Sequence, residues 1–315
     1  MNGIPRPGRV LAGILGLSAL TVSAAAVEAQ STRERLLVDA GWLAERLDHA
    51  DLVLLHVGSE EEYAAGHIPG ARHITLDAIS APEDHAAGSR MSLELPDPEV
   101  LARTLEDLGI SDDSRVVVYW GSDWVTPAAR VVFTLDWIGL GGRTVVLQGG
   151  MPAWQAAGGA VTAHVPTARR GRVTPRPRPE LVVSADWVHE RLTDPAYRVV
   201  DARAAVHYDG IQPTYLHRRP VRLGHVPGAA SIPAFELVDE AGRIRSEPEL
   251  RALFQASGVE AGQTVVGYCH LGQYATLLLF AARTLGYDVK LYDGSFQEWG
   301  SQDRPVELPP AAGGG

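Results

Sequence analysis

With 315 residues, the chain is long enough for two domains of ordinary size, each able to bury its own apolar core. Hydrophobic residues make up 45% of it and charged residues 21%, which is the composition of a globular protein rather than a disordered one. The formal net charge of −10, without any stripe of basic residues, argues against nucleic acid as a partner. An acidic protein that binds small anions therefore needs a local positive site.

The first 29 residues have the layout of a secretory signal peptide. Two arginines come first, an apolar run follows over 10–22, and small residues then lead to a cleavage site between about Ala26 and Ala29. The alternative is an uncleaved membrane anchor, but the run is shorter than the roughly 20 residues that a spanning helix needs. We therefore predict export to the periplasm or out of the cell, with no membrane insertion after cleavage.

The rest of the sequence contains one internal repeat. A GHIPGA motif at 66–71 returns as GHVPGA at 224–229, and an apolar strand-like run precedes each copy. Further on, RVVVYW at 115–120 matches TVVGYC at 264–269. Each of these runs leads through a short loop to an apolar helix-like stretch. Each half then closes with a third short strand and a segment that runs from a glycine to a tryptophan, 149–154 in the first half and 294–299 in the second.

Short β-branched runs that alternate with helical stretches indicate parallel strands buried on both faces. We predict an α/β fold of two tandem related domains, each a central, mostly parallel sheet flanked by helices. The domains are placed at 31–160 and 180–312, and the chain should end in a disordered Pro/Ala/Gly tail. The segment 161–179 is rich in Arg, Pro and Thr. Its apolar residues follow neither the period of a helix nor that of a strand, so it is predicted to be a linker.

One strand-to-helix turn of the second half carries the residues for chemistry. Cys269, the only cysteine of the chain, follows a buried strand, and a helix is expected to begin near Ala275. Ligands of open α/β sheets bind beyond the carboxyl ends of the strands. The amides of the turn and the positive end of the helix should stabilise a thiolate and lower its pKa below the usual value of roughly 8.5. Gly272 lets the turn curl so that more amides point inward.

Such a turn suits nucleophilic attack on a sulfane sulfur. The alternative is an inert cysteine that only packs under the helix. The sequence has no second cysteine and no histidine or carboxylate pair at ligand spacing, so we expect neither a metal nor another cofactor. Trp120 takes the place of Cys269 in the first half. The first domain should therefore be inactive and pack against the second.

The repeated motifs, the cysteine turn after a buried strand and the closing segments resemble those of tandem rhodaneses, over about 31–305. The resemblance implies an inactive N-terminal domain and a C-terminal domain whose cysteine carries a persulfide. It also implies a ping-pong cycle. Thiosulfate or 3-mercaptopyruvate would give sulfur to Cys269, which would pass it to cyanide or a thiol. We also expect a monomer.

The resemblance also implies the substrate-binding residues. The turn has the length found in sulfurtransferases, and Arg203 lies where thiosulfate enzymes carry an anion-binding arginine, although a salt bridge to Asp201 is the alternative. Thiosulfate enzymes often have Arg and Lys directly after the cysteine, and mercaptopyruvate enzymes tend to have small residues there. This chain has His270 and Leu271 at these two positions and so matches neither pattern, which leaves the preferred donor open. The predicted turn residues are His270, Leu271, Gly272, Gln273 and Tyr274.

Several other basic residues have more than one interpretation. His270 could carry positive charge, donate one hydrogen bond when neutral, or point to solvent. Three arginines before the second motif could form a positive rim or a solvated loop; they are Arg218, Arg219 and Arg222. His67 and His225 recur in a half without the cysteine, so we expect them to hydrogen-bond backbone rather than a ligand.

Two alternative functions fit parts of the pattern. Phosphatase chemistry on the same scaffold needs an arginine six residues after the cysteine to clamp phosphate oxygens, and that position is Ala275. A non-enzymatic sulfur carrier or binding module of an exported redox system would also use the cysteine turn. Turnover of cyanide to thiocyanate separates an enzyme from a carrier.

Overall fold

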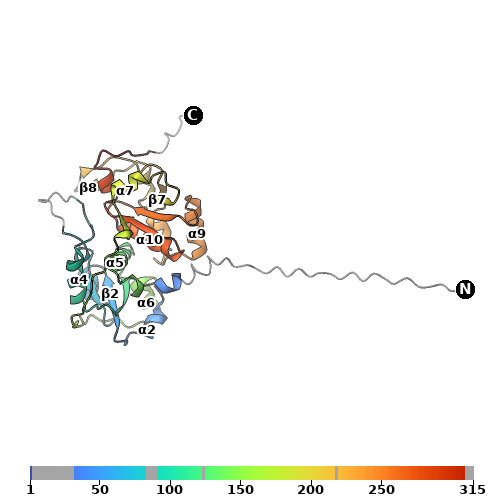
Figure 1. Ribbon diagram of the computed structural model, residues 1–315. Coiled ribbons are helices and arrows are strands. Elements are labelled where there is room, and N and C mark those ends of the chain that lie inside the picture. The colour runs from blue at the N-terminus through green and yellow to red at the C-terminus, as the bar shows by residue number, and fades with distance from the viewer. Residues whose placement is uncertain (2–31, 83–90, 123–124, 217–218, 309–315) are drawn as a thin grey trace.

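The computed structural model describes residues 1, 32–82, 91–122, 125–216 and 219–308. Two α/β domains follow each other in the chain, and each contains a five-stranded parallel sheet flanked by helices (Figure 1). The predicted fold class is therefore confirmed. The predicted signal peptide and the predicted disordered tail lie outside the described residues.

The first sheet has the strand order β1-β5-β4-β2-β3. Its strands are β1 (Leu37–Val38), β2 (Leu52–Val57), β3 (Arg72–Ile74), β4 (Arg115–Trp120) and β5 (Thr144–Leu147). The α-helices of this domain are α2 (Ala40–Ala44), α3 (Glu60–Ala65), α4 (Pro98–Asp107), α5 (Thr126–Trp137) and α6 (Gly150–Ala156).

The second sheet repeats the first, with the order β10-β7-β11-β12-β6. Its strands are β6 (Val182–Val183), β7 (Tyr197–Asp201), β10 (Ala230–Ser231), β11 (Thr264–Tyr268) and β12 (Val289–Tyr292). The helices are α7 (Ala185–Glu190), α8 (Ala205–Tyr208), α9 (Glu247–Ala256), α10 (Gln273–Thr284) and α11 (Ser295–Trp299), and a small antiparallel pair is added by β8 (Tyr215–Leu216) and β9 (Arg219–Pro220). The repeat in the sequence is thus a repeat of the fold.

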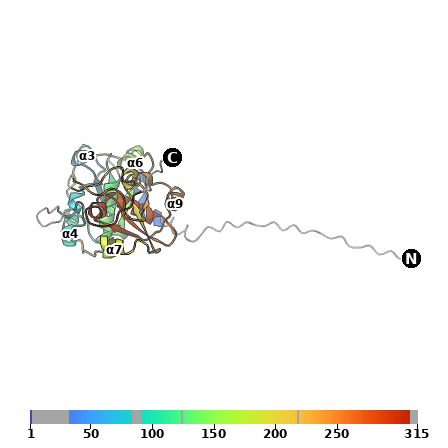
Figure 2. The same ribbon diagram turned by 90° about the horizontal axis from the view of Figure 1, so that it is seen from above.

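The two domains meet along α5 and α10, which lie side by side between the two sheets (Figure 1). Both helices are buried almost all round, because each packs on its own sheet with one face and on the other helix with the opposite face. One apolar cluster consequently runs through both domains. The view from above shows α4 and α9 on opposite sides of this shared core (Figure 2).

The predicted linker crosses the surface of the first domain in extended form. Its backbone is held there by hydrogen bonds, for example from Gly171 N to Glu106 O at 2.8 Å and from Arg178 N to Trp137 O at 2.7 Å. The segment is therefore fastened to the first domain before β6 begins. No helix within the described ranges is both long and apolar enough to span a membrane.

Candidate active site

Cys269 lies at the carboxyl edge of the second sheet, directly after the central strand β11. The turn is short, because α10 begins at Gln273, two residues before the predicted start. Gly272 caps this helix with φ at 83°, in the left-handed region that favours glycine. A β-carbon at Gly272 would lie 3.0 Å from an Asp293 carboxylate oxygen, so a side chain there would push on Asp293 in addition to straining the backbone.

The backbone of Cys269 is held by the segment that follows β12. Its N–H donates to Ser295 Oγ at 3.1 Å, and its carbonyl accepts from Phe296 N at 2.9 Å. Ser295 has φ at 52°, which is unfavourable for a residue with a β-carbon. The predicted closing segment of the second half therefore supports the cysteine, which the sequence did not reveal.

The sulfur of Cys269 sits in the predicted ring of amides. The N–H groups of Ala275, Leu271 and Tyr274 hydrogen-bond to it and favour the thiolate. Burial nevertheless dominates and raises the pKa of the Cys269 thiol, because the sulfur is almost completely shielded from water and a charge there loses its hydration. The prediction of a lowered thiol pKa is therefore wrong, although the predicted amides are present.

A cavity of about 290 Å³ opens at Cys269. It is large enough for a small molecule, so the cysteine is not turned into a closed apolar interior. The other residues that line it are Tyr215, His270, Leu271, Gln273 and Tyr274. Four of the five predicted turn residues thus line the cavity beside the cysteine, and Gly272 lies behind them.

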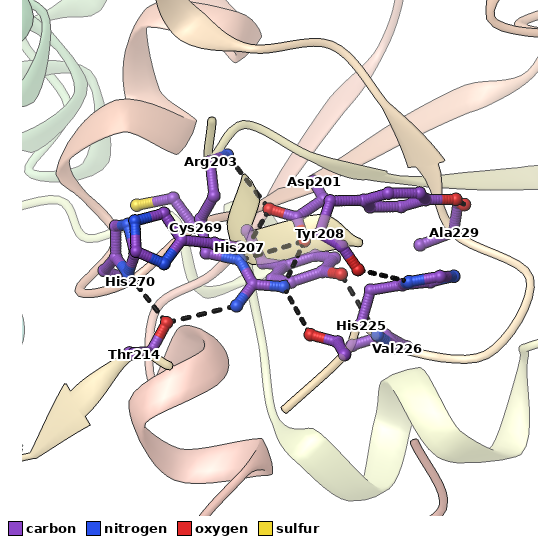
Figure 3. A network of polar contacts seen from close by, with 12 residues as sticks. Asp201, Arg203, His207, Tyr208, Thr214, His225, Val226, Ala229, Cys269 and His270 are labelled. Atoms are coloured by element: carbon purple, nitrogen blue, oxygen red, sulfur yellow. Dashed lines mark hydrogen bonds and ion pairs between the residues drawn. The ribbon is translucent and has the colours of Figure 1, made fainter. Parts of the chain in front are cut away.

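His270 is neutral and does not point freely into solvent. Its Nδ1 lies 2.8 Å from Thr214 Oγ1, and its ring meets the His207 ring edge-on with the centroids 4.5 Å apart (Figure 3). Burial, followed by the positive charge of Arg203 and by His207, lowers the pKa of His270 to about 3. Of the three interpretations, the imidazolium and the solvated side chain are therefore wrong.

Arg203 does not reach the cavity. Its side chain is fully buried, and Nε lies 3.0 and 2.9 Å from the two carboxylate oxygens of Asp201 (Figure 3). The guanidinium also donates to Thr214 Oγ1 at 3.1 Å and to Gly224 O at 2.8 Å, and it lies 3.9 Å above the ring centre of Phe296. The predicted contact with a donor anion is therefore wrong, and the alternative salt bridge is the one formed.

The predicted positive rim is not built as expected. Arg222 donates to main-chain carbonyls of the segment after α11, including Gly300 O at 3.4 Å, and so holds that segment rather than a ligand. Arg219 is exposed on β9 and does not line the cavity. Arg218 lies outside the described residues.

The two histidines of the repeated motifs have the predicted structural role. His67 Nδ1 lies 2.8 Å from Tyr63 O, and His225 Nδ1 lies 2.9 Å from Tyr208 O. Each ring also stacks on the ring of that tyrosine, with centroids 3.9 and 3.7 Å apart. Over the ranges that the structure describes, no cluster of three or more His, Cys, Asp or Glu side chains could hold a metal ion.

The first domain contributes directly to the turn. Gln273 Nε2 donates to Thr126 Oγ1, at the start of α5, at 2.9 Å. Trp120, the counterpart of Cys269, is buried against Gly242 of the second domain, as predicted. Sequence reasoning missed Thr126, Thr214 and Ser295, because their partners depend on how distant segments pack. Only the repetition of the closing segment hinted at Ser295.

Comparison with known proteins agrees with this arrangement. The sequence model of the family described as "Rhodanese-like domain" matches residues 39–157 and 184–302, and the chain belongs to this family. The 3-mercaptopyruvate sulfurtransferase of Escherichia coli K12 is 32% identical over 283 residues, which is 86% of this chain and 97% of the relative. Thiosulfate/3-mercaptopyruvate sulfurtransferase 1 of Arabidopsis thaliana, a mitochondrial protein, is 30% identical and covers 86% of this chain and 78% of its own.

Two solved structures support the same assignment. The crystal structure of SseA from Escherichia coli, a 3-mercaptopyruvate sulfotransferase, matches with a TM-score of 0.71 at 30% identity, over 82% of this chain and 98% of SseA. A structure of EanB in complex with ergothioneine matches with a TM-score of 0.77 at 25% identity, over 90% of this chain and 71% of that one. The chain is thus a transferase of the rhodanese type, with two rhodanese-like domains.

Proposed function

We propose that the protein moves a sulfane sulfur from a small donor to a thiol or cyanide through a persulfide on Cys269. The observation that carries this proposal is the buried sulfur itself, which faces an open cavity and accepts hydrogen bonds from three amides of its own turn. Sulfurtransferases among the relatives favour an enzyme over a non-enzymatic carrier. Phosphatase chemistry has no support, because the position for the clamping arginine is Ala275, whose amide points at the sulfur.

Each half of the proposed cycle is a displacement at sulfur. The Cys269 thiolate attacks the sulfane sulfur of the donor, a new S–S bond forms, and the rest of the donor leaves with the electron pair of the broken bond. That leaving group is sulfite from thiosulfate, or the pyruvate enolate from 3-mercaptopyruvate, which then takes up a proton. The acceptor next attacks the outer sulfur and releases the Cys269 thiolate. The three amides suit the negative outer sulfur of the persulfide.

We further propose that 3-mercaptopyruvate is the better donor. All described residues that line the cavity are uncharged, and the neutral His270 offers at most a hydrogen bond. Such a lining favours an anion with one negative charge over the thiosulfate dianion, because each charge that leaves water needs compensation. The 3-mercaptopyruvate sulfurtransferases among the relatives are in keeping with this choice.

The test is a steady-state comparison of the two donors with cyanide as acceptor, read out as thiocyanate. We expect turnover, a higher kcat/KM for 3-mercaptopyruvate, and an added mass of one sulfur atom on Cys269 in the absence of acceptor. The Cys269→Ser variant should fold and show neither turnover nor the added mass. Turnover by this variant would refute the persulfide mechanism, and a higher kcat/KM for thiosulfate would refute only the choice of donor.

Export remains a prediction from residues 1–29. We propose that the chain is cleaved near Ala29 and works outside the cytoplasm, which the N-terminal sequence of the protein recovered from the periplasm or culture medium would test. An intact N-terminus in the cytoplasmic fraction would contradict it.

A further inference from the structure

A buried arginine of the first domain reaches the turn that carries the cysteine. Arg130, in the middle of α5, is fully buried, and its Nη1 lies 2.6 Å from Asp293 Oδ1 in the second domain. Its Nη2 donates to the main-chain carbonyl of Leu93. A charge at this depth requires its partner, because an unpaired buried charge is strongly destabilising. The Arg130–Asp293 pair therefore fixes where Asp293 sits.

The same ion pair packs on the back of the cysteine turn. A β-carbon at Gly272 would lie 3.0 Å from Arg130 Nη1, 3.0 Å from Asp293 Oδ1 and 3.2 Å from Asp293 O. Gly272 is the residue from which α10 starts, and the first amides of that turn and helix point at the sulfur of Cys269. A movement of the pair would consequently move the amides that surround the sulfur.

The residues after Asp293 connect the first domain to the backbone of the cysteine. On one side, Ser295 and Phe296 hold the N–H and the carbonyl of Cys269. On the other side, Asp293 Oδ2 accepts from Leu95 N at 2.9 Å. The Gln297 side chain exchanges two hydrogen bonds with the backbone of Ser92, both at 3.1 Å. The segment 293–297 therefore lies between the first domain and the cysteine turn and contacts both.

A second ion pair across the same domain interface offers a comparison. Arg283, near the end of α10, lies 2.7 Å from Asp136, near the end of α5. This pair joins α5 to α10 and lies about 15 Å along α10 from the cysteine turn, given the rise of about 1.5 Å per residue, whereas Arg130 joins α5 to the segment after β12. Arg283 is less deeply buried than Arg130 and Asp136 also pairs with Arg178, so the second pair is a control for the loss of an ion pair between the domains away from the turn. Only the Arg130–Asp293 pair touches the turn.

We propose that Arg130 is a positioning residue for the chemistry of Cys269, acting through Asp293 on the turn at Gly272. The first domain, which has Trp120 in place of a cysteine, would then help to build the active site of the second. This inference rests on the proposed role of Cys269 as the sulfur nucleophile.

The experiment compares Arg130→Met with Arg283→Met as the matched control. For each variant, kcat and KM of sulfur transfer, the melting temperature and the pH dependence of Cys269 alkylation by iodoacetamide are measured. We expect Arg130→Met to lower kcat by roughly 10- to 100-fold with a smaller change in KM, as for a misplaced reacting group. Its alkylation profile should move to higher pH, because the Asp293 carboxylate is left uncompensated beside the turn and the amides lose their alignment.

Arg283→Met should lower the melting temperature while kcat stays within about twofold and the alkylation profile is unchanged. Arg130→Lys should recover part of the lost kcat, since it keeps the charge. If Arg130→Met does not fold, Asp293→Asn decides by kcat and by any change in the alkylation profile, because it weakens the hold on the turn with almost no change in volume. The charge left behind in this variant is the positive Arg130, so its electrostatic effect on the thiol has the opposite sign. An unchanged kcat and alkylation profile in the variant that folds would overturn the proposal.

Alkylation of Cys269 is measured without turnover, so it keeps this test separate from that of the proposed function. Turnover by Cys269→Ser would refute the persulfide mechanism and leave the alkylation result standing. An alkylation profile that Arg130→Met and Arg283→Met shift equally would refute the positioning role and leave the persulfide mechanism standing.

Discussion

Thr214 Oγ1 lies 2.8 Å from His270 Nδ1 and accepts a hydrogen bond from Arg203 Nη1 at 3.1 Å. The Thr214 hydroxyl therefore connects a buried guanidinium to the ring of a cavity-lining histidine. Arg203 thus helps to hold the His270 ring in place through one hydroxyl, although it does not line the cavity itself.

Replacing the Thr214 hydroxyl should release the His270 ring from this contact. We expect Thr214→Val to lower kcat/KM for the donor about tenfold, the equivalent of one lost hydrogen bond, and to lower the free energy of unfolding by about 1–3 kcal/mol, because Arg203 Nη1 loses its acceptor. Thr214→Ser is the matched control, since it keeps the hydroxyl. Equal kcat/KM values for the two variants would show that the hydroxyl has no part in substrate use.

Replacing Arg203 should lower the free energy of unfolding more than it weakens binding of the sulfur donor. Arg203→Ala leaves the buried Asp201 carboxylate without its partner, so we expect a loss of about 3–5 kcal/mol in the free energy of unfolding. Arg203→Lys should recover little of it, because an ammonium cannot form the two-pronged contact with the carboxylate. Urea unfolding measures the loss. A fully stable Arg203→Ala protein with a raised KM for thiosulfate would restore the binding role.

The elements that the sequence predicted well are those whose signal is local. The runs at 115–120 and 264–269 became the central strands β4 and β11 because strands covered on both faces are apolar throughout. The signal for the turn at Gly272 was also local, because a glycine directly before an apolar helix permits the positive φ that the structure has.

The features of the site that could not be predicted from the sequence are those that depend on burial by distant segments. Asp201 stands two residues from Arg203, so the sequence left both an ion pair and an open anion site available. The guanidinium is buried among partners such as Thr214, which lies 11 residues away in the chain, and this burial could not be read from the local sequence. Burial is also the reason why the pKa of the Cys269 thiol is raised and not lowered as predicted. The amides are local, but the shielding of the sulfur comes from distant segments. Arg130 was invisible as a site residue because its partner lies in the other domain.

Stability should fall in mild acid because of His270. Its pKa is lowered from 6.5 to about 3 in the folded chain, so below pH 6.5 the unfolded chain binds a proton that the folded chain does not. This contribution is present at neutral pH and is lost as the pH falls from 6.5 towards 3. At pH 5 the loss amounts to about 2 kcal/mol.

Urea unfolding at pH 7 and pH 5 measures this loss. His270→Gln should reduce the difference between the two pH values by that amount. His56 in the first domain, with its pKa lowered to about 4 mainly by burial, should keep part of the acid sensitivity in the variant. An unchanged pH dependence in His270→Gln would mean that His270 is accessible to protons in the folded protein.

Ser295 combines an unfavourable backbone conformation with support of the nucleophile, and two substitutions separate these effects. Both Ser295→Ala and Ser295→Gly remove the acceptor of the Cys269 N–H, which should lower kcat and cost about 1–3 kcal/mol as that buried amide loses its partner. The glycine variant alone relieves the positive φ, so it should be more stable than the alanine variant by about 1 kcal/mol. Unfolding free energies and kcat are measured for both. We expect the two variants to differ in stability and to share the same reduced kcat, because the hydroxyl, and not the φ angle, holds the cysteine. A glycine variant with wild-type kcat would instead assign the effect of the alanine variant to backbone strain.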